Sequence, residues 1–124
     1  PLRLVGSEMC IRDRFLTIME KKLPELDPDA DVLIVSHLGD GNVHYTVWPS
    51  RDDEQHKDKI MDAIENVVLS LGGSFSAEHG IGLSKLSSME RRKDRVALDV
   101  MRQIKHAIDP EGIMNPGKVL PKIY

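Results

Sequence analysis

Two histidines, His37 and His44, stand on either side of an Asp-Gly pair in the sequence. Strand-like apolar runs flank this pair, a pattern typical of a β-hairpin. A two-residue turn at Asp40 and Gly41 predicts that His37 lies directly opposite His44, on the same face of the sheet. Such partners have Cβ atoms about 4.5–5.5 Å apart, and two imidazoles this close can chelate one metal ion. The alternative is two unrelated strand histidines.

A third ligand is available in Glu78, which stands in a corner with glycines two and four residues later. Glycines let the backbone approach a ligand closely. A His-His-Glu set leaves an open coordination position, as in catalytic zinc sites. The alternative is that Glu78 is a surface turn carboxylate. The neighbouring His79 is then a candidate general base or a hydrogen-bond partner of the substrate. We expect His56 and His106 on exposed helix surfaces.

Three short segments predict the strands that position these residues. Val32–Val35 is a continuous apolar run rich in β-branched residues, which predicts a buried strand, and Val43–Val47 alternates apolar and polar residues, which predicts a second strand. Gly73–Ala77, just before Glu78, is expected to form a third strand.

Apolar residues at helical spacing predict the helices. The first ends over Phe15–Leu23 before Pro24, the second covers Asp53–Leu71, and the last begins at Ser87 and stops at Asp109-Pro110. Ser50 or Asp52 is expected to cap the second helix, and Gly72 to take the left-handed position after it. Ser87 and Glu90 have capping-box spacing. The element order predicts an α+β fold, a small antiparallel sheet with helices packed on one face.

Composition excludes several classes of protein. The 124 residues include 17 basic and 20 acidic side chains, a net charge of -3, which gives no support for nucleic-acid binding. There is no run of about 18 apolar residues that could span a membrane. The one cysteine excludes a disulfide scaffold. The glycines form no G-x-G-x-x-G motif, so a dinucleotide-binding fingerprint is absent from the sequence.

The first fourteen residues differ in character from the rest. Residues 3–14 read RLVGSEMCIRDR, which matches the in-frame translation of a widely used transposase sequencing adapter. We therefore interpret residues 1–14 as non-native and expect native sequence from Phe15, with an N-terminal portion missing. Cys10 falls in this segment, so it supports no thiol chemistry. The alternative is the start of a short amphipathic helix.

Three motifs, in this order and spacing, resemble one family. They are SHLGDGNVH at residues 36–44, GSFSAEHGIG at residues 73–82, and DPEGIMNPGK at residues 109–118. Together they resemble the C-terminal domain of FAD-linked oxidases, the group of D-lactate, glycolate and D-2-hydroxyglutarate dehydrogenases. The resemblance implies that residues 15–124 are the C-terminal part of a substrate domain. It also implies an N-terminal FAD domain of the vanillyl-alcohol-oxidase type.

The resemblance also implies a reaction and its residues. A D-2-hydroxy acid is oxidised to the 2-keto acid, and hydride passes from the substrate Cα to the flavin N5. His37, His44 and Glu78 match the positions that bind a divalent cation, often zinc, and His79 matches the residue that takes the hydroxyl proton. Asn115, in the N-P-G-K segment, is implied as a cofactor contact. D-2-hydroxyglutarate dehydrogenases often have His-Leu-Asn after the second ligand, whereas this chain has Thr46 in place of the asparagine.

Two other functions are weighed against a flavin-dependent dehydrogenase. One is a stand-alone zinc hydrolase built on the two histidines and Glu78, and the other is a non-catalytic interaction module with structural histidines. The favoured interpretation implies a small 2-hydroxy-acid substrate, FAD held mainly by the missing domain, and an unspecified electron acceptor. We expect a cytoplasmic protein, with peripheral membrane association only through that acceptor.

Overall fold

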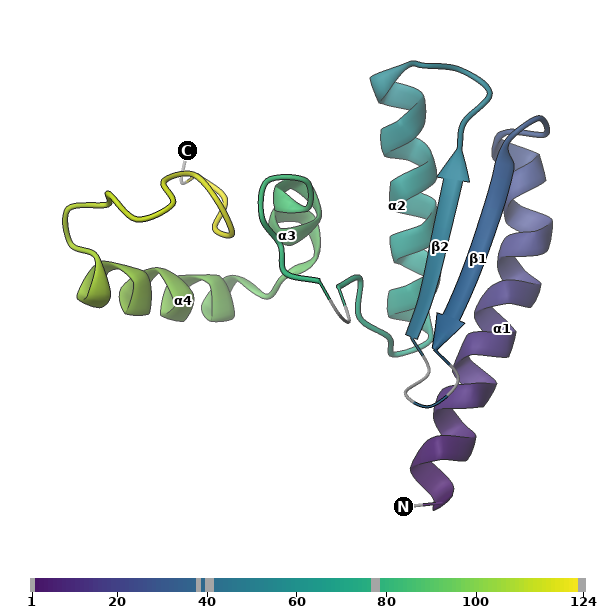
Figure 1. Cartoon of the computed structure of the whole chain (residues 1–124), viewed down its shortest axis with the longest axis horizontal. Helices are drawn as coiled ribbons and strands as arrows, with labels where there is room; N and C mark the ends of the chain where they lie inside the picture. The colour runs from purple at the N-terminus through teal and green to yellow at the C-terminus, as the bar shows by residue number, and fades with distance from the viewer. Residues whose placement is uncertain (1, 38, 40–41, 77–78, 123–124) are drawn as a thin grey trace. The chain divides into compact units, whose positions relative to one another are not determined.

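The computed structural model describes residues 2–37, 39, 42–76 and 79–122, with side chains described from residue 11 onward (Figure 1). The chain divides into two compact units, Pro1–Ala77 and Glu78–Tyr124, and each unit is described by itself. Among the described residues the elements are α1 (Leu2–Leu26), β1 (Asp31–His37), β2 (Asn42–Trp48), α2 (Glu54–Ser70), α3 (Leu86–Arg92) and α4 (Arg95–Ile108). None of these helices is long and apolar enough to cross a membrane.

The first unit packs α1 and α2 on one face of the β1–β2 hairpin (Figure 1). The core joins side chains of both helices to alternate residues of β2; its members include Phe15, Met19, Leu23, Val43, Tyr45, Val47, Ile60 and Val67. The ring of Phe15 meets Tyr45 edge to face, with ring centres 5.3 Å apart. Removing each large apolar side chain from water contributes about 1.5–3 kcal/mol. The predicted α+β fold, a small antiparallel sheet with helices on one face, is confirmed.

The hairpin has a different register from the one that the Asp-Gly turn predicts. His37 pairs with Asn42, and Val35 pairs with His44. A two-residue turn would make Gly39 the last paired residue of the first strand, whereas the last paired residue of β1 is His37. Four residues instead of two therefore lie between the last paired residues, His37 and Asn42. Asp40 and Gly41, the predicted turn residues, lie outside the described residues. The prediction that His37 lies directly opposite His44 is wrong.

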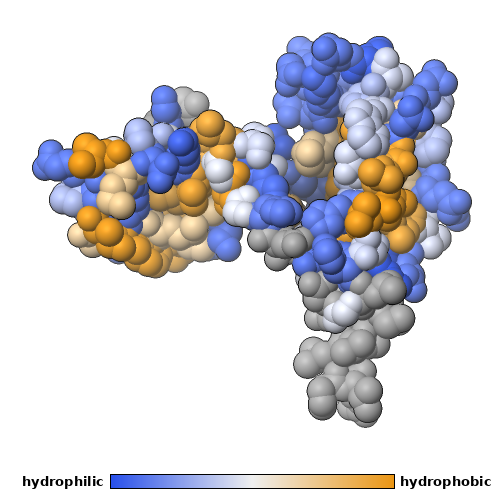
Figure 2. All heavy atoms as spheres, viewed as in Figure 1, coloured by the Kyte–Doolittle hydropathy of each residue, from blue (hydrophilic) through white to orange (hydrophobic). Residues whose placement is uncertain are grey.

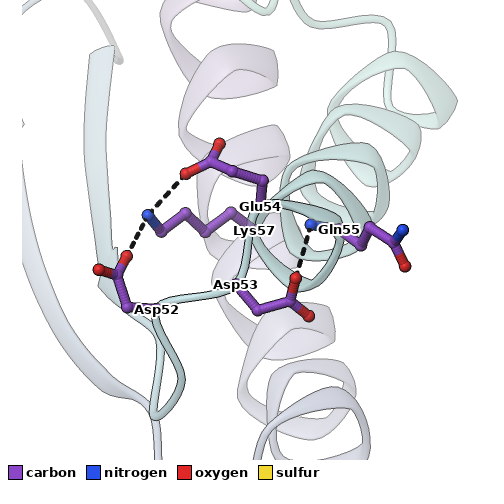
Figure 3. Close-up of polar contacts among 5 residues, drawn as sticks. All are labelled: Asp52, Asp53, Glu54, Gln55 and Lys57. Carbon is purple, nitrogen blue, oxygen red and sulfur yellow. Dashed lines mark hydrogen bonds and ion pairs between the residues drawn. The ribbon is translucent and has the colours of Figure 1, made fainter.

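Hydrogen bonds at both ends fix the limits of α2. The carboxylate of Asp53 accepts from the amide of Gln55 at 3.1 Å, so Asp53 is the N-cap in place of the predicted Ser50 or Asp52 (Figure 3). Lys57 pairs with Asp52 and Glu54, and these hydrogen bonds raise the pKa of Lys57 above its ordinary value (Figure 3). Both carboxylates are exposed and Lys57 is half-buried, so the ion pairs contribute little stability.

The C-terminal end of α2 is a Schellman motif. The amide of Gly72 donates to the carbonyl of Leu69 at 3.0 Å, and the amide of Gly73 donates to that of Val68 at 2.9 Å. Gly72 has φ +78°, which confirms the predicted left-handed residue. No third strand follows in the described residues 73–76, contrary to our prediction. Ser74 Oγ accepts from the amide of Ser76 instead, a local bond that competes with strand pairing.

The other helices also differ from their predicted limits. α1 continues through Pro24 to Leu26, because a proline in the last turn removes only one hydrogen bond of the helix. The single helix predicted to begin at Ser87 is two helices, α3 and α4. Asp94 separates them, since its carboxylate accepts from the amide of Ala97 at 2.9 Å and caps α4. Ser87 lies inside α3, which begins at Leu86 without a side-chain cap.

The second unit buries few apolar side chains. Met89 of α3 and Leu98 of α4 are its buried hydrophobic residues among those described. α4 is strongly amphipathic, but a row of apolar residues at four-residue spacing stays exposed along it (Figure 2). This row consists of Val96, Val100, Ile104 and Ile108. A contiguous apolar surface of this kind is typical of a contact with another surface.

A buried histidine–carboxylate pair joins the loop that follows α1 to the first turn of α2. His56 Nε2 lies 2.8 Å from Asp27 Oδ2, and both residues are buried. The amide of Ser50 also donates to Asp27, and Arg51 reaches Nδ1 of His56 at 3.1 Å. The prediction that His56 is exposed is therefore wrong, whereas His106 is exposed as predicted.

We predict that this pair makes stability depend on acid pH. Hydrogen bonds from Ser50 and His56 hold the pKa of Asp27 well below its ordinary value of 3.8. A carboxyl with a lowered pKa in the folded state stabilises that state above pH 3.8 and loses this contribution as the pH falls below it. Asp27→Asn should lower the denaturant midpoint at neutral pH and flatten its dependence on pH below 4 (about the ordinary carboxyl range). Urea unfolding from pH 2 to 7 (about the window that spans carboxyl titration) measures this, and Asp52→Asn is the exposed control. Parallel pH profiles for Asp27→Asn and the unsubstituted chain would contradict it.

Candidate functional site

The two strand histidines share one face of the hairpin although they are not directly opposite. His44 pairs with Val35, and His37 lies two residues after Val35 on β1. Residues two apart on a strand point to the same face, so both imidazoles lie on one face of the sheet. Their ring centres lie 5.3 Å apart, with an angle of 70° between the ring planes. Imidazole nitrogens bind zinc at about 2.0–2.1 Å, so rings this close can each offer one nitrogen to a single ion. The structure thus brings together the first two predicted ligands.

This histidine face is the one that the helices leave uncovered. Val43, Tyr45 and Val47 pack into the core, so the alternate residues of β2 face the other way. On that face, exposed apolar residues continue from the histidines along both strands: Leu33, Val35 and Trp48. His44 is half-buried and His37 is exposed. An uncovered apolar stripe next to two imidazoles suits a small organic ligand with a polar group at one end.

Tyr45 follows His44 directly but is no part of this face. Its ring packs against Phe15 in the core, and burial raises the pKa of its phenol above 10.0. The phenol therefore stays protonated near neutral pH and does not compete with a histidine for the role of base. Thr46, the next residue, is exposed and shares the face of His44.

The third predicted ligand, Glu78, lies outside the described residues. Within the described ranges, no three histidine, cysteine or acidic side chains are grouped as a metal site. The described part of the chain therefore supplies two ligands of the predicted set, His37 and His44. Their imidazoles are of the type that suits zinc.

His79, the predicted base, begins the described part of the second unit and is exposed. Lys85 Nζ lies 3.5 Å from the carbonyl oxygen of His79. Farther along this loop Gly82 adopts φ +56°, and its carbonyl accepts from the amide of Val119 at 3.0 Å. The C-terminal segment is thus tied to the loop that carries His79.

Asn115, the predicted cofactor contact, lies in that C-terminal segment. It is exposed and has φ +47°, a left-handed conformation that asparagine tolerates better than most residues. The amide of Lys118 donates to its carbonyl at 3.3 Å, and Lys118 Nζ lies 3.4 Å from its Oδ1. A cavity of about 420 Å³ separates this segment from α4; Met101, Ile104, Ile108, Met114, Asn115 and Val119 are among its lining residues.

Two residues that support the segment before Asn115 are not predicted from the sequence. Asp109 is buried at the end of α4, and Lys105 one turn earlier contacts its carboxylate. A signal was available, because an acidic residue at a helix C-terminus opposes the helix dipole and a lysine four residues earlier compensates it. The Asp109-Pro110 pair predicts only the end of the helix.

Comparison with known proteins gives one family. The model of the family described as FAD linked oxidases, C-terminal domain, matches residues 12–119. An uncharacterized FAD-linked oxidoreductase of Mycobacterium tuberculosis is 42% identical over 83 residues, 67% of this chain and 18% of that protein. D-2-hydroxyglutarate dehydrogenase of Stutzerimonas stutzeri is 33% identical over 112 residues, 85% of this chain and 24% of that protein. The mitochondrial D-lactate dehydrogenase [cytochrome] of Arabidopsis thaliana is 32% identical over 120 residues, 93% of this chain and 21% of that protein. The chain thus spans about a fifth of the length of these relatives.

We predict that the hairpin register can be read directly in solution. Cross-strand nuclear Overhauser effects should connect Val35 with His44 and Ser36 with Val43, as the pairing requires. The alternative register of a two-residue turn would instead connect His37 with His44 and Ser36 with Tyr45. Observing that second set, in a sample whose α2 resonances are helical, would overturn the geometry of the histidine pair.

Proposed function

The chain belongs to the family of C-terminal domains of FAD-linked oxidases, and from this we propose that it is the substrate-side part of a flavin-dependent 2-hydroxy-acid dehydrogenase. The observation that carries this function is the juxtaposition of His37 and His44 on an uncovered, partly apolar sheet face. D-lactate and D-2-hydroxyglutarate, named for the relatives, are both small 2-hydroxy acids. Such a substrate has a polar end for the imidazoles and a short carbon chain for the apolar stripe.

We propose that residues 15–124 form this part and that residues 1–14 are non-native sequence. FAD is held mainly by another portion of the enzyme, because the chain carries no phosphate-binding glycine motif. The exposed apolar row of α4 supports a contact with such a portion. Asn115 contributes a cofactor contact from the turn between α4 and the C-terminal residues.

In the proposed reaction the Cα–H and O–H bonds of the substrate break and a C=O bond forms. FAD, when bound, supplies the acceptor for the hydride, which carries both electrons from Cα. His79 receives the hydroxyl proton, because a neutral imidazole matches this task near pH 7. The glycines that follow His79 allow its loop to approach a substrate closely.

We further propose that His37, His44 and Glu78 hold a divalent cation, with zinc as the first candidate. The two imidazoles support this, since they are close enough to share one ion. The cation, when bound, would lower the pKa of the substrate's hydroxyl group. The chain's own contribution is to hold both imidazoles on paired strands, whose hydrogen bonds limit how far the rings can separate.

We predict that zinc binds this chain and that His44 is required. His44→Ala should weaken binding by about 10- to 100-fold or more, because even indirect disturbance of a metal ligand costs this much. Titration calorimetry at pH 7 (about 0.5 above the ordinary histidine pKa) measures the affinity. His106→Ala, which removes an exposed histidine of α4, is the matched control. Equal affinities for His44→Ala and the unsubstituted chain would exclude the site.

We predict that His79→Asn slows reduction of the flavin by substrate about 10²-fold or more, because it removes the base. The measurement is stopped-flow absorbance in the enzyme that joins this chain to its FAD-binding portion, with FAD and metal contents determined for each variant. His106→Asn controls for loss of a surface histidine. An unchanged reduction rate in His79→Asn, with both contents normal, would remove His79 from the mechanism.

A further inference from the structure

Asp109 occupies an electrostatically unfavourable position. It is the C-cap of α4, where the helix dipole presents partial negative charge, and the residue is only 6% exposed. A carboxylate buried there is costly unless it is paired and hydrogen-bonded. The presence of an acidic residue at such a position calls for a compensating role.

The compensation comes from one lysine and two backbone amides. Lys105 Nζ contacts Asp109 Oδ2, and Lys105 also donates to the carbonyl of Met114 at 2.6 Å. Asp109 Oδ1 accepts from the amide of Ile113 at 3.1 Å, and Oδ2 accepts from the amide of Met114 at 2.9 Å. Lys105 above all, and then these amides, hold the pKa of Asp109 below its ordinary value. The carboxylate therefore stays charged near neutral pH and binds the loop that follows the helix.

These bonds fix the chain immediately before Asn115. Met114 is held through both its amide and its carbonyl. Beyond Asn115 the chain is held again, because the amide of Val119 donates to Gly82. Val119 adopts φ +70° there, a conformation that a β-branched residue rarely takes. Backbone strain of this kind persists only where the surroundings enforce it.

The geometry points to Asp109 and Lys105 as positioning residues for Asn115, which hold the 113–118 turn so that the asparagine side chain is presented to the flavin cofactor. This inference rests on the proposed function, which assigns Asn115 to the cofactor. If Asp109 and Lys105 only stabilised the end of α4, their substitution would lower the stability of the fold and leave the affinity for FAD unchanged. If they position Asn115, their substitution also weakens FAD binding, and this loss disappears when Asn115 is already replaced.

The first experiment tests the local lock in the chain itself by NMR. Asp109→Asn and Lys105→Met should speed exchange of the Met114 amide by roughly 10- to 100-fold, the loss expected for hydrogen bonds to a charged group. Both should also change the backbone coupling constant of Asn115. Asp99→Asn is the matched control, since it removes an exposed α4 carboxylate that pairs with Arg102. Unchanged exchange and coupling in both variants would overturn the inference.

The second experiment is a double-mutant cycle in the enzyme that joins this chain to its FAD-binding portion. The FAD dissociation constant and the flavin absorption spectrum are measured for Asn115→Ala, Asp109→Asn and the double variant. We expect each single change to weaken FAD binding by about fivefold or more, and the double variant to bind no more weakly than Asn115→Ala. Lys105→Met replaces Asp109→Asn in the cycle if the latter does not fold.

The outcomes separate the two proposals. Additive losses in the double variant, or an effect of Asn115→Ala without one of Asp109→Asn and Lys105→Met, would overturn the positioning role and leave the cofactor contact in place. An unchanged spectrum and FAD affinity in Asn115→Ala would overturn the cofactor contact itself and, with it, the positioning role.

Discussion

Strand alternation along the β1–β2 hairpin is the constraint on which the first unit depends. The same pairing that turns Val43, Tyr45 and Val47 toward α1 and α2 turns His44 to the opposite face. A slip of one residue would expose the core side chains and bury the histidine. Packing of the core therefore enforces the orientation of the candidate ligand, with no separate device needed at the site.

Two buried carboxylates perform the same task in the two units. Asp27 follows α1, and Asp109 follows α4. Each accepts a backbone amide from a later loop and is matched by a basic partner, His56 in one case and Lys105 in the other. Asp27 fixes backbone 23 residues later at Ser50, whereas Asp109 fixes backbone four and five residues later at Ile113 and Met114. These two pairs explain why loops without regular structure have definite conformations.

Sequence periodicity predicts the two strands and the helical regions, but the third strand expected over Gly73–Ala77 is not found in the described residues 73–76, and the junctions between elements differ from the predictions. The apolar spacing of β2 and of α2 is the spacing that the core uses. The apolar run Val32–Val35 does form β1, but its side chains are exposed, so the prediction that this strand is buried is wrong. The hairpin register did not follow, because Asp-Gly is a turn signal that does not fix how far the ladder extends. His56 was assigned to the surface, because its partner Asp27 is 29 residues away in the sequence and no local pattern indicates the pair. The break at Asp94 was missed, since Ser87 offered a capping pattern of equal quality.

The candidate site follows the same division. Residue types and an even spacing in the sheet were enough to place two imidazoles on one face, because an error of two residues in register preserves the face. No periodicity in the sequence predicts what holds the 113–118 turn. The conformation of Asn115 depends on the ion pair between Lys105 and the buried Asp109 and on the strained backbone at Val119. Side chains held by strands are thus inferable from periodicity, whereas side chains held by loops require the tertiary contacts. Catalytic groups on loops need such supports, because small displacements of a reacting group lower the rate strongly. In other loops of this kind, the feature to seek is therefore the buried charge behind the turn, in addition to the polar residue at its tip.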